Sequence, residues 1–203
     1  NPRYISTVDS GNLISYLWLV ENTFYEFLKK PFINIKDISK GIVDLLNLSM
    51  EEIEEKQDYI KSKEILDTFE GNICSFIKIL KELKLQVYKT IKEKDNLYWN
   101  EKLYKTIKVF LDDFNSFFPW IEFIEENKIT ESIDDSIIKK LLNLATEYSI
   151  ENFEKATLEI NNYFRNNKEK HSKELLNYIE KSSCEIKELK DNIYFIMISQ
   201  VMD

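Results

Sequence analysis

The side chains best suited to bind a ligand are concentrated near the amino terminus. Seven hydrogen-bonding side chains lie within ten consecutive positions: Arg3, Tyr4, Ser6, Thr7, Asp9, Ser10 and Asn12. A carboxylate can accept from two adjacent hydroxyls while Arg and Asn supply donors, so this density suits a polyhydroxylated ligand. The alternative is that Asp9 or Ser10 caps a helix and the other side chains are solvated. The frequency with which Asp and Ser cap helices favours this alternative on chemistry alone.

Three tryptophans, Trp18, Trp99 and Trp120, carry flat apolar faces that could stack on sugar rings. Trp18 is the first candidate because it lies on the first predicted helix, beside its main apolar stripe. Aromatic residues at helical spacing are nevertheless more often part of a core than of a ligand platform.

Other chemistry has little support in the sequence. A zinc cluster is excluded by the single histidine, His171, and by the distance of 110 positions between Cys74 and Cys184. The two cysteines are expected as small core residues. Acidic runs such as Glu51–Glu55 are expected on solvated faces or at helix starts. We therefore expect neither a metal nor a cofactor, and no catalytic residue can be assigned.

Composition narrows the class of protein. The 203 residues include 28 Lys and Arg against 36 Asp and Glu, which gives a net charge of −8. This acidic balance argues against nucleic-acid partners and against direct contact with anionic membranes. Only three Gly and three Pro are present, which favours helices over an all-β fold. Two cysteines give no disulfide framework, so a reducing, cytoplasmic location is expected.

Apolar residues spaced by three and four positions predict an all-α fold. The expected helices span about 10–29, 36–47, 49–68, 73–91, 97–118, 134–148, 150–166 and 169–202. Ser49 and Glu52 match a capping box that would begin the third of these helices. The first helix carries a wide apolar stripe, which we expect to face the core: Leu13, Tyr16, Leu17, Val20, Phe24, Phe27 and Leu28. These elements predict a multi-helix antiparallel bundle, with residues 1–12 as a motif loop, residues 13–203 as helices, and one domain or a fragment of a larger protein.

The segment from Pro2 to Leu13 resembles a motif of the cyclic β-1,2-glucan synthases. These are very large, membrane-anchored bacterial proteins that combine a glycosyltransferase, a glycoamylase-like middle region and a phosphorylase-like region. Phe118-Pro119-Trp120 and Val201-Met202-Asp203 are similar to further short segments of the middle region. Between these borders the resemblance extends only to helical character.

The resemblance implies that the chain is a helical segment of that middle region, which is an (α/α) toroid handling β-1,2-glucan by transglycosylation. Asp9 would face the sugar, supported by Arg3, Tyr4, Ser10 and Asn12. The partners would be a β-glucan oligosaccharide and neighbouring domains of a parent anchored in the inner membrane, and the segment would be inactive alone. The alternative is a helical interaction or scaffold module without ligand chemistry, because everything after Leu13 is ordinary amphipathic helix.

Overall fold

The computed structural model describes residues 7–126, 135–167 and 172–202. The described residues form nine helices and no sheet, which confirms the all-α prediction. The helices are α1 (Thr7–Lys29), α2 (Ile35–Glu51), α3 (Gln57–Asp67), α4 (Ile73–Glu93), α5 (Tyr98–Phe117), α6 (Pro119–Glu126), α7 (Asp135–Asn143), α8 (Ile150–Asn166) and α9 (Ser172–Met202). The closed toroid that the resemblance implies stays a prediction, as does the assignment of the chain to one domain.

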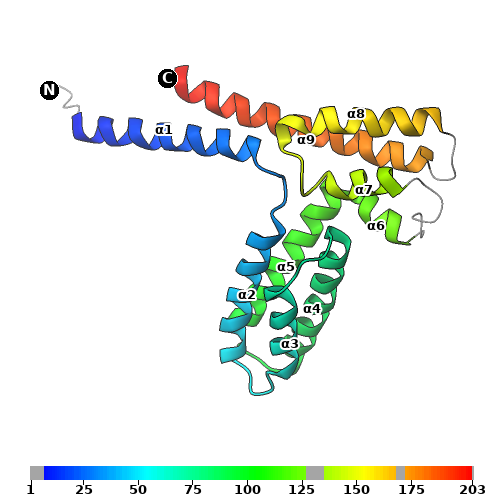
Figure 1. Cartoon of the computed structure of the whole chain (residues 1–203). Coiled ribbons are helices and arrows are strands. Elements are labelled where there is room, and N and C mark those ends of the chain that lie inside the picture. Colours follow the sequence, from blue (N-terminus) through cyan, green and yellow to red (C-terminus); the bar gives the residue numbers. More distant parts are fainter. Residues whose placement is uncertain (1–6, 127–134, 168–171, 203) are drawn as a thin grey trace.

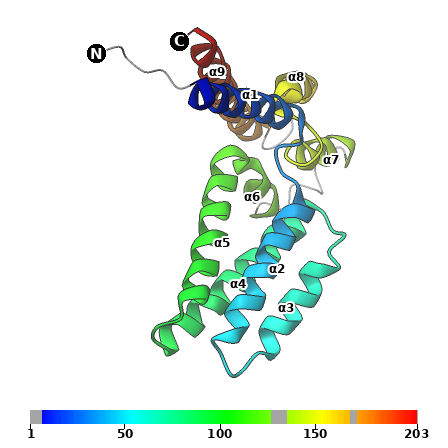
Figure 2. The same cartoon turned by 90° about the vertical axis from the view of Figure 1, so that its left-hand side faces the viewer.

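The helices lie in two groups. Helices α2, α3, α4 and α5 pack side by side as a bundle, with α5 contacting both α2 and α4 (Figure 1). Helices α8 and α9 form a long pair that crosses one end of this bundle together with α1 (Figures 1 and 2). Helices α6 and α7 lie between the groups, and Trp120 of α6 is fully buried there, with its indole N–H donating to the carbonyl oxygen of Leu141.

Local sequence explains where several helices begin and end. Asn34 accepts hydrogen bonds from the backbone N–H groups of Lys36 and Asp37, and so caps the start of α2. Asn72 caps α4 in the same way through the N–H of Ser75. Pro119 ends α5 and occupies the first position of α6, where its missing N–H costs nothing. Helix α5 ends at Phe117, one residue from its predicted end.

Two predicted helix starts are wrong. Helix α1 begins at Thr7, so Asp9 and Ser10 lie inside its first turn and not at its cap, and residues 7–12 are helix instead of loop. Helix α2 continues through Ser49, whose hydroxyl donates back to the carbonyl oxygen of Leu45 in the preceding turn. Ser49 and Glu52 therefore form no capping box, because Ser49 is a buried residue within a helix and Glu52 lies at its end.

Candidate functional site

Helix α1 is anchored to the core near its carboxyl-terminal end. Leu28 is fully buried and Phe24 packs against the core. The connection to α2 is held by two backbone hydrogen bonds, from the N–H of Phe32 to the carbonyl of Tyr148 and from the N–H of Ile33 to the carbonyl of Ala145. The end of α1 is thus fixed in direction, while its amino-terminal half extends away from the bundle (Figure 1).

The extended half of α1 exposes large apolar side chains. Tyr16 and Trp18 are 68% and 67% exposed, and Ile14 and Leu19 are exposed to a similar extent. The hydroxyl of Ser15 bonds to the helix's own backbone, at the carbonyl of Gly11. This half of α1 therefore presents a largely apolar surface to solvent.

The expected inward stripe of the first helix is only partly correct. Leu28 is buried, Phe24 packs against the core and Leu17 is half-buried, whereas Tyr16, Val20 and Phe27 are exposed. The side chain of Leu13 lies outside the described residues. The sequence carries part of the signal that was missed: Ile14, Trp18 and Leu19 lie outside the stripe, so the apolar surface of α1 is wider than the stripe. A helix with so wide an apolar surface can be fixed in place by only part of it.

The sequence-predicted ligand residues are only partly described. Arg3 and Tyr4 lie outside the described residues, as do the side chains of Asp9 and Ser10. Asn12 and Trp18 are both exposed on α1. At 3.6 residues per turn, six positions place them about 120° apart around the helix, so they do not share one face.

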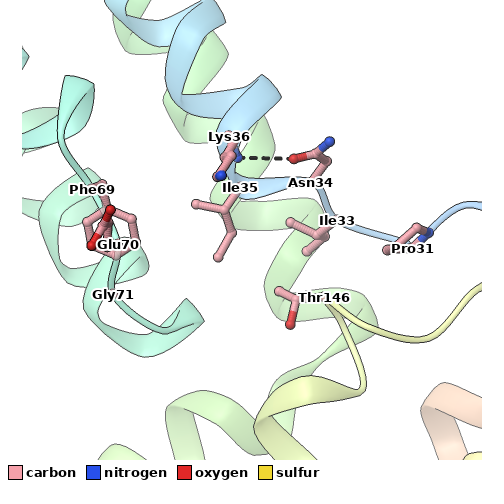
Figure 3. Close-up of a pocket in the computed structure, with 9 residues that line it drawn as sticks. All are labelled: Pro31, Ile33, Asn34, Ile35, Lys36, Phe69, Glu70, Gly71 and Thr146. Atoms are coloured by element: carbon pink, nitrogen blue, oxygen red, sulfur yellow. Dashed lines mark hydrogen bonds between the residues drawn. The ribbon is translucent and has the colours of Figure 1, made fainter.

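A groove lies between the start of α2 and the connection from α3 to α4, with a volume of about 520 Å³ (Figure 3). Nine residues line it: Pro31, Ile33, Asn34, Ile35, Lys36, Phe69, Glu70, Gly71 and Thr146. A Cβ atom at position 71 would lie 2.6 Å from the ring of Phe69, so a larger residue there would have to displace that ring. The lining holds no nucleophile paired with a base, and the amide of Asn34 is already used in capping α2 (Figure 3). None of the predicted ligand residues lines this groove.

A polar cluster inside the bundle joins α2, α3 and α5. The carboxylate of Glu52 accepts from the backbone N–H groups of Trp99 and Asn100, at 2.9 to 3.1 Å, and from the Asn100 side chain at 3.0 Å. The same Asn100 amide donates to the carbonyl of Ser49 and accepts from the hydroxyl of Tyr59 at 2.7 Å. Glu52 therefore caps the start of α5, a helix 47 residues away, which no local sequence signal could reveal.

The electrostatics of this cluster follow from its hydrogen bonds. Burial alone would raise the pKa of Glu52, but the N–H donors of Trp99 and Asn100 hold that pKa below its ordinary value of 4.5. Burial raises the pKa of the Tyr59 phenol above its ordinary value. A carboxylate that is ionised and engaged by three donors is suited to joining helices and not to accepting a proton in catalysis.

Further sequence-based expectations concern metal binding and the cysteines. They include no group of three or more His, Cys, Asp or Glu side chains that could hold a metal ion, and no helix long and apolar enough to cross a membrane. Cys184 is exposed on α9, contrary to the expectation that it is a core residue. His171 lies outside the described residues.

No protein-family model matches the sequence, and comparisons with curated proteins and with solved structures return no match. The described part of the chain is an all-α bundle from which one helix with large exposed apolar side chains extends. The resemblance to the cyclic β-1,2-glucan synthases depends on the short motifs alone.

Proposed function

We propose that this protein is a helical interaction module whose docking element is α1. The observation that carries the proposal is the exposure of large apolar side chains, above all Tyr16 and Trp18, along the extended half of that helix. The bundle of α2 to α5, joined to α8 and α9, acts as the support that fixes the direction of α1.

The physical basis is the cost of leaving this surface in water. Apolar area contributes about 25 cal/mol per Å² when it is removed from solvent. Clustered exposed apolar side chains on a protein surface mark interaction sites. Single exposed apolar residues, such as Leu85 on α4, carry no such meaning because they are normal on protein surfaces.

The test compares Trp18→Glu with Leu85→Glu, which is a matched control because Leu85 is 59% exposed on a different helix. Both variants are studied at a concentration where sedimentation shows a monomer. Trp18→Glu should lower the binding of the apolar dye ANS and leave the midpoint of urea unfolding unchanged, while Leu85→Glu should alter neither. If Trp18→Glu lowers that midpoint strongly, α1 packs on its own bundle and the proposal is wrong.

A second function is favoured by Trp18. The chain would be a segment of a bacterial carbohydrate-active enzyme acting on β-1,2-glucan, as the motif from Pro2 to Leu13 suggests. The exposed indole of Trp18 supports this candidate, because a flat aromatic face in water can stack on a sugar ring. Asp9, Ser10 and Asn12 belong to the same helix and would supply polar contacts, with Arg3 and Tyr4 preceding it.

NMR titration with β-1,2-glucan oligosaccharides tests this second function. The indole N–H signal of Trp18 should move, while those of Trp120, which is buried, and Trp99 should not. A β-1,4-linked oligosaccharide of equal length is the control ligand. Trp18→Ala should weaken the binding, and Leu85→Ala should not. An unmoved Trp18 signal at millimolar sugar would exclude the glucan function for this chain.

A further inference from the structure

The groove beside the start of α2 continues along that helix. A second hollow, with a volume of about 460 Å³, adjoins it and shares the lining residues Ile35, Lys36, Phe69 and Glu70. The second hollow is also lined by Ser39 and Lys40 of α2 and by Leu66, Asp67 and Thr68 at the end of α3. The two hollows form one groove, here called the α2 groove, with α2 as one wall and residues 66–71 as the other (Figure 3).

Hydrogen bonds fix the two walls of the α2 groove in place. The buried Ser39 hydroxyl donates to the carbonyl oxygen of Leu66 at 2.7 Å, which joins α2 to the end of α3. Near the start of α2, the backbone N–H of Ile33 donates to the carbonyl oxygen of Ala145 at 2.8 Å. The groove is therefore largely preformed, as small-ligand sites usually are.

The two walls carry opposite charges. Lys36 and Lys40 belong to the α2 wall and lie four positions apart, on one face of the helix. Asp67 and Glu70 belong to the other wall. All four residues are exposed, and within the described part of the chain none of them forms an ion pair. Two positive and two negative groups thus remain available to a ligand.

We infer that the α2 groove binds a short, extended peptide segment in which acidic and basic side chains alternate. Successive side chains of an extended chain point in opposite directions, so the acidic ones face the lysines of α2 and the basic ones face Asp67 and Glu70. Residues two apart in such a chain are separated by about 6.6 Å, close to the rise of about 6 Å between Lys36 and Lys40. The inference concerns a site separate from α1 and does not depend on the docking function of that helix.

The opposite charges of the walls select against other classes of ligand. A nucleic acid or an anionic membrane would meet Asp67 and Glu70 as well as the lysines, and like charges repel. A small zwitterion would leave one charge on each wall without a partner. In a peptide, the aliphatic stems of Lys or Arg side chains can also cover the apolar lining at Ile35 and Phe69.

Fluorescence anisotropy of the full chain with a labelled octapeptide of alternating Glu and Lys tests the inference. The control peptide has the same composition in two blocks, four Glu followed by four Lys. The alternating peptide should bind about tenfold more tightly than the control, and added salt should weaken its binding. Equal affinities for the two peptides, or no binding of the alternating one at millimolar concentration, would overturn the inference.

Reversing the charge of one wall tests which residues bind the peptide. Lys36→Glu combined with Lys40→Glu should weaken binding of the alternating peptide by about tenfold, because both walls are then acidic. The same variant should bind an octapeptide of Lys alone more tightly than the wild type does. The matched control is Lys102→Glu with Lys108→Glu, two exposed positions on α5 outside the groove, which should change neither affinity. Circular dichroism should show equal helicity in all three proteins, since Glu is favourable near a helix start.

Amide NMR signals locate the bound peptide. The signals of Gly71 and Thr146, which line the groove, should move on titration, and Trp18→Glu should leave the affinity unchanged. Shifts confined to α1 would overturn this inference while supporting the docking function of that helix. A single-stranded oligonucleotide or phosphatidylserine vesicles that bind through the same lysines more tightly than the peptide would also overturn it and point to a phosphate ligand.

Discussion

Helices α1 and α4 have nearly equal lengths, 23 and 21 residues, but opposite environments. In α4 the apolar residues recur on one side and Lys and Glu occupy the other, and six residues of the apolar side are buried. In α1 the apolar residues spread beyond one face, and among its described side chains only Phe24 and Leu28, near its end, reach the core. The position of α4 is therefore determined inside this chain, whereas most of the apolar surface of α1 has no partner among the described residues.

The comparison shows that total hydrophobicity is a poor guide to burial. A helix with apolar residues on one face has a unique orientation on a core, because its charged face must stay in water. A helix whose apolar surface is wider than the face it buries leaves large side chains in water, so its place depends on which surfaces are available. Experiments that perturb α4 and α1 separately test this difference in burial.

The largest effect is expected from Leu80→Ala in α4. Leu80 is fully buried, so the substitution removes apolar contacts and leaves a cavity, which should lower the free energy of unfolding by about 2–5 kcal/mol. Urea denaturation followed by circular dichroism measures this change. A loss below about 1 kcal/mol would mean that α4 is no better packed than α1, and the contrast between the two helices would disappear.

Asn100→Ala tests whether the bundle also depends on polar contacts that α1 lacks. The substitution leaves the carbonyl of Ser49 and the hydroxyl of Tyr59 without their Asn100 partner, and should cost about 1–3 kcal/mol in unfolding free energy. The control is a double-mutant cycle with Tyr59→Phe. The double variant should lose less than the sum of the single ones, and strict additivity would show that the pair is not coupled.

Glu52→Gln should have a smaller and pH-dependent effect. At neutral pH, loss of the charged cap on α5 should cost on the order of 1 kcal/mol. Because the pKa of Glu52 is lowered in the folded protein, its contribution is fully present above about pH 4.5 and is lost as the pH falls through the folded pKa. Unfolding free energies of wild type and variant should therefore converge in acid. A difference that is constant with pH would contradict the capping role.

The smallest effect is expected from Trp18→Ala in the monomer. Trp18 makes few contacts with the body, so the unfolding free energy should change by no more than about 0.5 kcal/mol, despite the loss of the largest side chain in α1. Thermal unfolding of a dilute sample measures it, with Leu85→Ala as the matched control. A cost similar to that of Leu80→Ala would place α1 in the core.

Much of the fold could be predicted from local patterns, but the candidate site could not. Helix α8 was predicted at its observed bounds, and α4 within two residues, since apolar spacing and nearby caps act over a few positions. The role of Glu52 could not be predicted, because its partners at Trp99 and Asn100 are distant in sequence. The exposure of Tyr16 could not be predicted either, because Tyr16 belongs to the apolar stripe and its environment depends on where the bundle stops.

By itself the sequence determined the all-α class, the positions of most helices and the inward faces of the amphipathic ones. These features depend on interactions between residues three or four positions apart, and they are the same wherever the helix is placed. Only the tertiary structure decided that α1 extends away from the bundle beside the end of α9, and that Glu52 caps α5. Such relations join segments far apart in the chain, and the packing of whole helices, not the preference of any one segment, selects them.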